Sequence, residues 1–106
     1  MSGKASYNII WEFTVAEEHR ADFEASYGPS GSWAQLFRKG EGYIETQLLA
    51  DEERVNVYLT IDRWVSREHF ERFKVAYDAD YRKLDEQLEG VAGSERRIGA
   101  YSSVTL

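Results

Sequence analysis

Four side chains with useful chemistry alternate within residues 54–64. They are the amide of Asn56, the phenol of Tyr58, the carboxyl of Asp62 and the indole of Trp64. Because successive side chains of a strand point to opposite faces, this spacing places all four on one face of a predicted strand. A face that mixes rings, an amide and a carboxylate suits a ligand pocket or a contact with a partner subunit.

The other face of the same predicted strand is aliphatic. It carries Val55, Val57, Leu59 and Ile61 at every second position. Such a row of branched apolar residues favours a surface that is buried in the protein core. We therefore predict that the aliphatic face forms the wall for a helix and that the mixed face is the functional one.

Asp62 is the residue of the mixed face best suited to general acid–base chemistry, and Glu12 is a second candidate on another predicted strand. Burial beside Trp64 or Trp11 would raise the pKa of either carboxyl and make it a usable base near neutral pH. The alternative is an ion pair with an arginine such as Arg97. Both interpretations stay open for Asp62, whereas the ion pair is favoured for Glu12.

Six elements are predicted to position these residues. Alternation predicts strands at about 6–14, 42–51, 54–64 and 95–104, and apolar spacings of three and four predict helices at about 16–26 and 66–88. The order strand, helix, strand, strand, helix, strand is typical of an α+β, ferredoxin-like βαββαβ fold. In that fold a four-stranded antiparallel sheet carries two helices on one face.

A glycine-rich loop, Gly28-Pro-Ser-Gly-Ser32, separates the first predicted helix from Trp33. It lacks the Gly-Lys-Ser/Thr ending of a phosphate-binding loop and follows a helix rather than a strand, which excludes that motif. We interpret it as a flap over a cavity, with Trp33 as the lid.

Composition narrows the classes of function. The 106 residues predict a single domain over 1–106, with its core at about 6–104. A net charge of -6 opposes binding to nucleic acids and to anionic membranes, and the absence of cysteine excludes disulfides and Cys-type metal sites.

No apolar run approaches the ~20 residues of a membrane span, so a cytoplasmic location is expected. No histidine or carboxylate spacing is typical of a metal site, so no metal is predicted.

Two helices can cover only one face of such a sheet. Large groups on both faces of the predicted strands therefore require a second cover, and an identical subunit across a two-fold axis is the simplest one. We predict a homodimer. The aromatic content of 14% is high for a small domain and indicates rings that line a cavity or an interface.

Several segments resemble one known family. They are Tyr7-Asn-Ile-Ile-Trp-Glu-Phe13, the Phe23…Tyr27-Gly28 end of the first helix, Gly42-Tyr-Ile-Glu-Thr46, and Ile61-Asp-Arg-Trp-Val-Ser66 with Phe70. The last passage, in which a Trp, one residue and a capping Ser lead into a helix, is similar to the end of the third strand in the antibiotic biosynthesis monooxygenase-like family. The resemblance covers about residues 6–104 and implies the dimeric α+β barrel of that superfamily.

The resemblance also implies a range of activities. Family members oxidise anthrone-like phenols with dioxygen and without cofactor, degrade haem or oxidise quinols, and the superfamily includes isomerases. We expect a cofactor-independent, monooxygenase-like protein that acts on a small hydrophobic aromatic or quinoid compound. A non-catalytic ligand-binding or stress-associated dimer, and an isomerase or cyclase with Asp62 as the base, are the alternatives. Haem binding is disfavoured because His69 lies beside a predicted helix cap and His19 lies among charged residues.

Candidate site residues follow from this resemblance, since similar phenol-oxidising enzymes use Asn, Trp, Tyr and Arg groups. The predicted catalytic residues are Asn56, Trp64, Tyr58 and Asp62. The predicted substrate-binding residues are Trp33, Tyr77, Tyr81, Phe73, Arg38 and Asn8. Purely structural roles stay open for two of the rings: Trp64 could pack under the start of the second helix, and Tyr58 could lie in the dimer interface.

Overall fold

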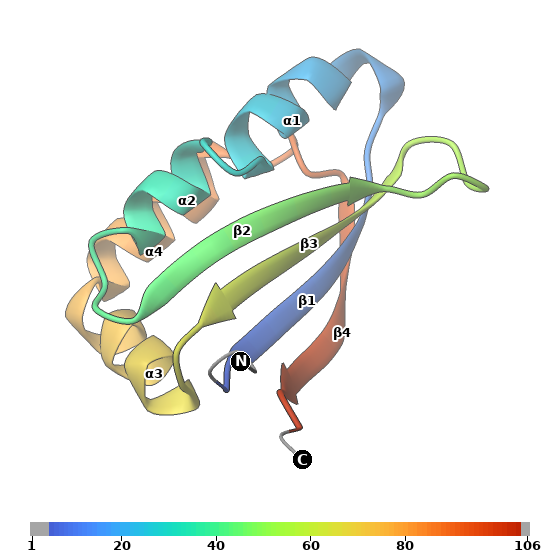
Figure 1. The fold of residues 1–106 in the computed structure, drawn as a ribbon. Helices are drawn as coiled ribbons and strands as arrows, with labels where there is room; N and C mark the ends of the chain where they lie inside the picture. Colours follow the sequence, from blue (N-terminus) through green and yellow to red (C-terminus); the bar gives the residue numbers. More distant parts are fainter. Residues whose placement is uncertain (1–4, 105–106) are drawn as a thin grey trace.

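One antiparallel sheet organises the protein. The computed structural model describes residues 5–104, so the first four and last two residues of the predicted domain 1–106 lie outside the described part. The strands are β1 (Tyr7–Thr14), β2 (Tyr43–Ala50), β3 (Val57–Trp64) and β4 (Ser94–Ser102). Their order across the sheet is β2-β3-β1-β4, with β1 and β3 at the centre (Figure 1). The predicted ferredoxin-like fold is thus confirmed.

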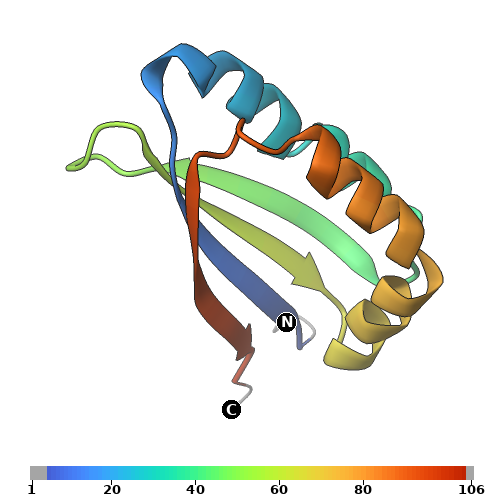
Figure 2. The ribbon, with the colours of Figure 1, turned by 180° about the vertical axis from the view of Figure 1, so that it is seen from behind.

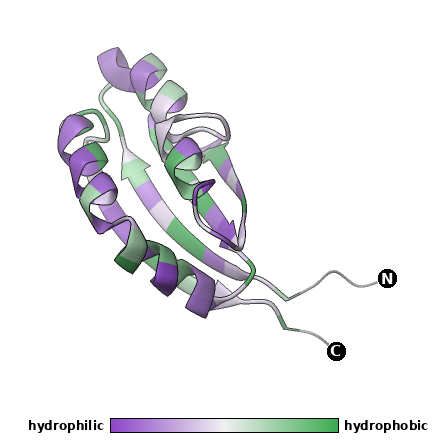
Figure 3. Cartoon of the chain, turned by 90° about the vertical axis from the view of Figure 1, so that its left-hand side faces the viewer, coloured by the Kyte–Doolittle hydropathy of each residue, from purple (hydrophilic) through white to green (hydrophobic). Residues whose placement is uncertain are grey.

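All helices cover the same face of this sheet (Figures 1 and 2). Between β1 and β2 lie a short 3-10 turn, η1 (Glu17–His19), and the helices α1 (Arg20–Tyr27) and α2 (Ser32–Phe37). Between β3 and β4 lie α3 (Arg67–Ala76) and α4 (Asp78–Gln87). Figure 3 shows hydrophobic and hydrophilic segments alternating along the strands, as expected for a sheet whose two faces have different surroundings.

The helix predicted at 66–88 is divided in two. Ser66 caps its start as expected, because its Oγ accepts a hydrogen bond from the backbone N–H of His69 at 3.2 Å. Tyr77 then leaves helical geometry, with φ -116° and ψ 30°, and α4 begins at the next residue. After this bend α4 packs against α2, while α2 also reaches the α3 end of the sheet, where the Phe37 ring lies 5.5 Å from that of Phe73, between centroids.

The prediction about the two faces of β3 is wrong in one respect. The mixed set, from Tyr58 to Trp64, points toward the helices, and the aliphatic residues Leu59 and Ile61 lie on the uncovered face. The reason is the register with β1, in which Tyr58 pairs with Phe13. Rings of α1 and α3 fill the wide space between sheet and helices, so the large side chains of β3 are needed there.

The core between sheet and helices is dominated by aromatic packing. Trp64 and Phe23 are completely buried, at 0% exposure. The Trp64 ring lies 5.1 Å from that of Phe73 and 5.9 Å from that of Phe37, between centroids. Burying such rings contributes most of the apolar stabilisation in a domain of this size.

The uncovered face of the sheet has an apolar centre with ion pairs beside it. Leu49 and Tyr101 are 46% and 51% exposed, and Leu59 and Ile61 are half-buried between them. Beside this apolar centre, Glu12 of β1 accepts hydrogen bonds from Arg54 at 2.7 Å and from Arg96 at 3.1 Å. The ion pair favoured for Glu12 thus exists, but with these partners rather than with Arg97.

Among the helices of residues 5–104, none combines the length and the apolar character that a crossing of a lipid bilayer requires.

Candidate functional site

A cavity of about 200 Å³ lies between the sheet and the helices α1, α2 and α4. Residues from all four strands and three helices contribute to it, so the fold as a whole shapes the site. Its lining consists of Trp11, Phe13, Tyr27, Trp33, Phe37, Thr46, Thr60, Asp62, Tyr81, Asp85 and Glu95.

Asp62 brings the principal polar group to the centre of this lining. It lies on β3 opposite Thr46 of β2, and the Thr46 Oγ1–H donates to Asp62 Oδ1 at 2.8 Å. The Tyr43 hydroxyl is 2.7 Å from Thr46 Oγ1. Because the single Thr46 proton is used on Asp62, the Tyr43 hydroxyl must be the donor in that second bond. A directed chain from Tyr43 through Thr46 therefore holds the Asp62 carboxylate in place.

The environment of Asp62 favours its neutral form. Its accessible surface faces the cavity, and protein surrounds the rest of the group, so burial raises the pKa of the Asp62 carboxyl to about 6, against a smaller opposing effect of the Thr46 hydrogen bond. No cationic side chain of residues 5–104 shifts this pKa. Of the two interpretations left open for Asp62, the ion pair with an arginine is not formed within residues 5–104, and the carboxyl is half-buried at the cavity.

Aromatic side chains form most of the cavity wall. The rings of Tyr27 and Trp33 are 6.2 Å apart, and those of Trp33 and Tyr81 are 4.9 Å apart, between centroids. Burial, with the nearby carboxylates, raises the pKa of Tyr81 to about 12. The Tyr81 phenol consequently stays protonated at neutral pH and can donate a hydrogen bond. The wall is suited to a flat ligand, which it can contact on several sides.

Two further carboxylates mark the mouth of the cavity. Asp85, on α4 one turn after Tyr81, and Glu95, at the start of β4, are both exposed. Both also line a second, adjoining hollow near residues 88–93. Partial burial, reinforced by the negative charge of Asp85, raises the pKa of Glu95.

Three of the predicted site residues meet in this cavity: Asp62, Trp33 and Tyr81. Trp33, at the start of α2, is only 8% exposed and closes the cavity on the helix side. Its indole N–H is buried without a hydrogen-bond partner in the described part of the chain. Two residues before Trp33, Gly31 packs closely against α1, because a side chain at Gly31 would meet the Ala25 carbonyl oxygen at 2.4 Å.

Two of the predicted catalytic residues lie in the surrounding core. Trp64 packs beneath the start of α3 against Phe70 and Phe73, which is the structural arrangement that the sequence left open. Tyr58 lies under α1 on the helix side of the sheet, where its hydroxyl donates to Glu24 Oε2 at 2.6 Å and accepts from Arg20 Nε at 3.0 Å. This position lies on the face of the sheet that the helices cover.

Two predicted amide groups lie outside the cavity. Asn56 precedes β3 rather than belonging to it, and its φ of +66° places it in the left-handed region, which asparagine tolerates. The loop that it ends projects beyond the sheet in Figure 1. Asn8 points to the uncovered face, where its Nδ2 donates to the Tyr101 carbonyl at 3.1 Å and its Oδ1 accepts from Arg63.

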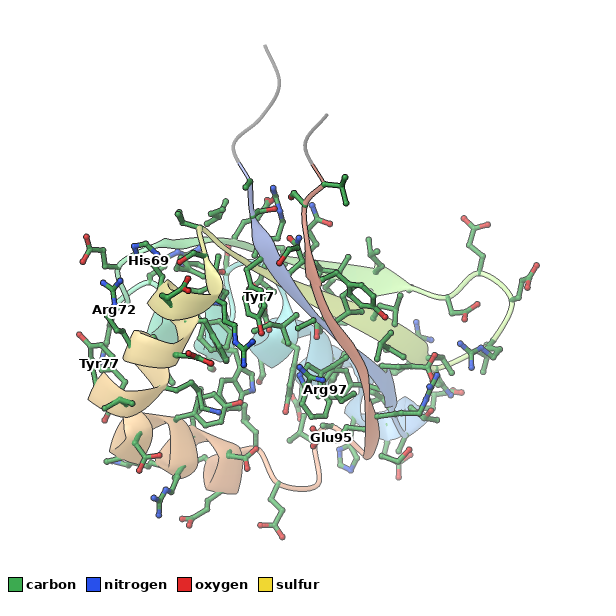
Figure 4. All side chains as sticks on the ribbon, turned by 90° about the horizontal axis from the view of Figure 1, so that it is seen from below. Tyr7, His69, Arg72, Tyr77, Glu95 and Arg97 are labelled. Atoms are coloured by element: carbon green, nitrogen blue, oxygen red, sulfur yellow. The ribbon has the colours of Figure 1, made fainter. Side chains whose placement is uncertain are left out.

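The remaining predicted ligand contacts, Phe73, Tyr77 and Arg38, also do not line this cavity. Phe73 is buried in the core, and the Tyr77 hydroxyl donates to the Lys39 carbonyl at 3.2 Å. Arg38 is exposed and donates to the Pro29 carbonyl at 2.9 Å. Phe73 and Tyr77 instead line a separate hollow on the outside of α3, near His69 and Arg72 (Figure 4).

Sequence reasoning missed Thr46, Tyr27, Asp85 and Glu95. Thr46 occupies a strand position that faces Asp62 only in the observed hairpin register, and no local pattern signals that pairing. Asp85 could have been found from its position four residues after Tyr81 on one helix face.

No metal site is evident in the described part of the chain. Residues 5–104 contain no group of three or more His, Cys, Asp or Glu side chains placed to hold an ion.

Solved structures of similar fold cover almost the whole chain. A mutant of SnoaB, a cofactor-independent oxygenase from Streptomyces nogalater, has a TM-score of 0.69 at 18% identity, with 95% of each chain covered. Protein SO0527 from Shewanella oneidensis has a TM-score of 0.66 at 15% identity, covering 95% of this chain and 93% of its own. PA3566 from Pseudomonas aeruginosa reaches 0.62 at 15% identity, covering 100% and 99%.

No curated protein matches the sequence. The model of the family described as antibiotic biosynthesis monooxygenase matches residues 6–76, which include β1 to β3 and α3. This match takes in more than half of the chain and contains Asp62, Thr46 and Trp33. The chain therefore belongs to the antibiotic biosynthesis monooxygenase family.

Proposed function

We propose that the protein is a cofactor-independent, monooxygenase-like enzyme that acts on a small hydrophobic aromatic or quinoid compound. The observation that carries the proposal is the Asp62 carboxyl, which has no charged partner among residues 5–104 and opens into a cavity walled by aromatic rings. A base with a pKa about one unit below neutral is largely ionised at pH 7 and still accepts a proton readily. Family membership and the fold shared with the oxygenase SnoaB support the oxygenase chemistry.

The volume of the cavity limits the size of the substrate. Sites for drug-sized ligands are typically about 300–1,000 Å³. A volume of about 200 Å³ is smaller and suits a compound with one or two fused rings. The aromatic walls favour a planar molecule over a flexible chain.

The reaction that we propose uses only the substrate, dioxygen and the side chains of this cavity. Asp62 accepts the proton of a phenol, and the resulting phenolate carries carbanion character at its para carbon. Dioxygen takes electrons from that carbon and forms a C–O bond to it, and the para C–H is then lost while the O–O bond breaks. One oxygen atom stays in a para-quinone and the other leaves as water, so the phenol loses four electrons and dioxygen gains four.

The other groups of the site hold the reactants in place. Thr46 and Tyr43 orient the Asp62 carboxylate, and Trp64, whose ring lies 5.4 Å from that of Tyr43, positions this chain from the core. Tyr81 and Trp33 supply N–H and O–H donors and ring faces to the substrate. The aromatic lining keeps water from the carbanion, which protects it from reprotonation.

We also propose that the protein is a homodimer formed through the uncovered face of the sheet. The half-buried Leu59 and Ile61 and the exposed Leu49 and Tyr101 give that face an apolar centre, and the Arg63–Glu45 pair, at 2.6 Å, gives it a polar rim. A two-fold axis would bring the same residues of both copies together. Sedimentation at micromolar concentration should give twice the chain mass of 12.3 kDa; a monomer mass would refute the dimer.

The same carboxylate also supports a second candidate, an isomerase or cyclase of the superfamily. Both functions begin with proton transfer to Asp62, but only the oxygenase consumes dioxygen. A protein that binds the ligand without converting it would show neither proton transfer nor oxygen uptake. These three outcomes separate the alternatives that the sequence left open.

The experiment uses 1-naphthol, a two-ring phenol whose oxidation to 1,4-naphthoquinone follows the stoichiometry above. Oxygen uptake and quinone formation should depend on the protein and fall by about 10²- to 10⁴-fold in Asp62→Asn. Asp78→Asn, the same change on an exposed ion pair of α4, is the matched control and should retain the rate. Asp62→Asn with an unchanged rate, or hydrogen exchange from deuterated solvent without oxygen uptake, would refute the oxygenase proposal.

A further inference from the structure

We propose that the cavity selects aromatic ligands that carry a protonated amine over uncharged ones, and rejects aromatic carboxylates. This inference rests on the proposed function, because it takes the cavity to be the ligand site, and it adds the charge class of the substrate. Neither the family nor the fold specifies this charge.

The first observation is the one-sided charge of the lining. Three carboxylates, Asp62, Asp85 and Glu95, belong to it, whereas Lys, Arg and His are missing from the lining that the described residues form. The other ionisable lining groups are the phenols of Tyr27 and Tyr81, whose pKa values burial raises. They stay neutral, so only negative charge faces the cavity at neutral pH.

Two cations near the cavity lie outside its lining. The Lys74 ammonium lies 4.2 Å from the centroid of the Tyr81 ring, and its charge is not among the causes that shift the pKa of Asp62 or of Glu95. Arg97 follows Glu95 by two residues on β4 (Figure 4). It has no part in the ion pairs found in residues 5–104, and its charge does not offset the raised pKa of Glu95.

The second observation is the arrangement of the carboxylates around the rings. Asp62 lies at the floor on β3, and only one of its oxygens is used in the hydrogen bond from Thr46. Asp85 and Glu95 lie at the mouth, from α4 and β4. Between floor and mouth stand the rings of Trp11, Trp33 and Tyr81. Aromatic faces attract organic cations, most strongly where water is displaced.

These features together define a preferred ligand. An ammonium group at the mouth would meet Asp85 and Glu95 while its ring system reaches the wall near Asp62. A carboxylate at the same place would add a like charge to a lining in which the described residues supply no cation. An uncharged ring compound would desolvate the mouth carboxylates without compensation.

The test compares three naphthalene compounds that share a ring system and differ in charge. They are 1-naphthylmethylamine, 1-naphthylmethanol and 1-naphthoate, titrated calorimetrically into the full protein at pH 7.5 in low salt. We expect the amine to bind about tenfold more tightly than the alcohol, and the naphthoate to bind weakest. Added salt should narrow the difference, because the mouth residues are exposed.

Variants separate the mouth from general surface charge. The double variant Asp85→Asn/Glu95→Gln should reduce the preference for the amine over the alcohol by about fivefold, because it weakens amine binding and removes the desolvation cost that the alcohol meets at the mouth. Asp78→Asn, on the exposed face of α4, should retain the preference, and Arg97→Gln should not weaken amine binding. Circular dichroism confirms that each variant is folded, and all of these positions are exposed.

The outcomes distinguish this inference from the proposed function. Equal binding of the amine and alcohol, tightest binding of the naphthoate, or an unchanged preference in the double variant would overturn the charge selection. If 1-naphthol oxidation still depended on Asp62 in that case, the proposed function would stand alone. Failure of all three compounds to bind would overturn the inference, and an Asp62-independent oxidation would in addition overturn the proposed function.

Discussion

Two carboxylates on opposite faces of one sheet have opposite environments. Glu12 on β1 faces the uncovered side, where hydrogen bonds from Arg54 and Arg96 lower its pKa. Asp62 on β3 faces the helices, where burial raises its pKa to about 6 and a neutral hydroxyl is its hydrogen-bond partner. In the sequence both carboxyls appear as possible bases next to a tryptophan. Their difference shows that arginine partners keep one carboxylate ionised and structural, whereas burial without a cationic partner in the described residues leaves the other chemically poised.

The largest expected effect concerns packing on the two faces. Trp64→Ala should lower the free energy of unfolding by about 3–5 kcal/mol, because it removes a fully buried ring. Leu49→Ala on the uncovered face should lower the free energy of unfolding by much less than this at protein concentrations where the chain is monomeric. Urea unfolding of both variants gives the comparison. Equal losses at every concentration would mean that the two faces are buried alike.

A second prediction concerns stability and pH at Asp62. Its pKa is raised in the folded protein, so the folded state binds the proton more tightly, and ionisation above about pH 6 opposes folding. A shift from 3.8 to about 6 corresponds to about 3 kcal/mol at high pH. Asp62→Asn should therefore stabilise the protein at pH 8 by about 2–3 kcal/mol and give no gain near pH 4.

Glu12→Gln is the counterpart and should have the opposite sign. Because the pKa of Glu12 is lowered in the folded state, its ionised form supports folding above its unfolded pKa of about 4.5 and loses that effect as the pH falls. The substitution should destabilise the protein at pH 7 and have no effect at pH 3. Thermal unfolding of both variants across this pH range would reveal the contrast; parallel curves would argue against it.

A smaller effect is expected at Thr46. Thr46→Val removes the hydrogen bond to Asp62, which should raise the pKa of Asp62 further and move the acidic limb of the pH–activity profile upward. The same substitution also removes the hydrogen bond from the Tyr43 hydroxyl, and the loss of both bonds should cost about 1–2 kcal/mol of stability. Thr46→Ser keeps the donor and serves as the control. An identical pH profile in the wild type and Thr46→Val would show that the hydrogen bond does not tune the base.

Much of the fold was predictable because its signals are local. Alternation identified the strands, and Ser66 marked the start of α3. The direction of the β3 faces was not predictable, since Val57-to-Ile61 and Tyr58-to-Trp64 alternate equally well. Only the pairing of Tyr58 with Phe13 and the rings contributed by the helices decide which set is covered. These are contacts between distant parts of the sequence.

The candidate site, like the fold, combines residues that local sequence signals predict with residues that only contacts between distant segments identify. Asp62, Trp33 and Tyr81 could be nominated by residue type, but Thr46 is distinguished only by its position opposite Asp62 in the hairpin. The loop before β3 runs through Asn56 and is longer than the gap between the strands predicted at 42–51 and 54–64, because β2 ends at Ala50 and β3 begins at Val57. Asn56 itself entered the predicted strand although its left-handed backbone ends the loop.

The most direct test of the central claim is the titration of the Asp62 carboxyl by carbon-13 NMR. Isotope-labelled wild-type protein is compared with Asp62→Asn to assign the signal, and Glu12 serves as the internal reference. We predict a midpoint near pH 6 for Asp62 and one below 4.5 for Glu12. A midpoint for Asp62 at or below 3.8 would show that its carboxylate is solvated or paired, and would contradict its assignment as a buried base.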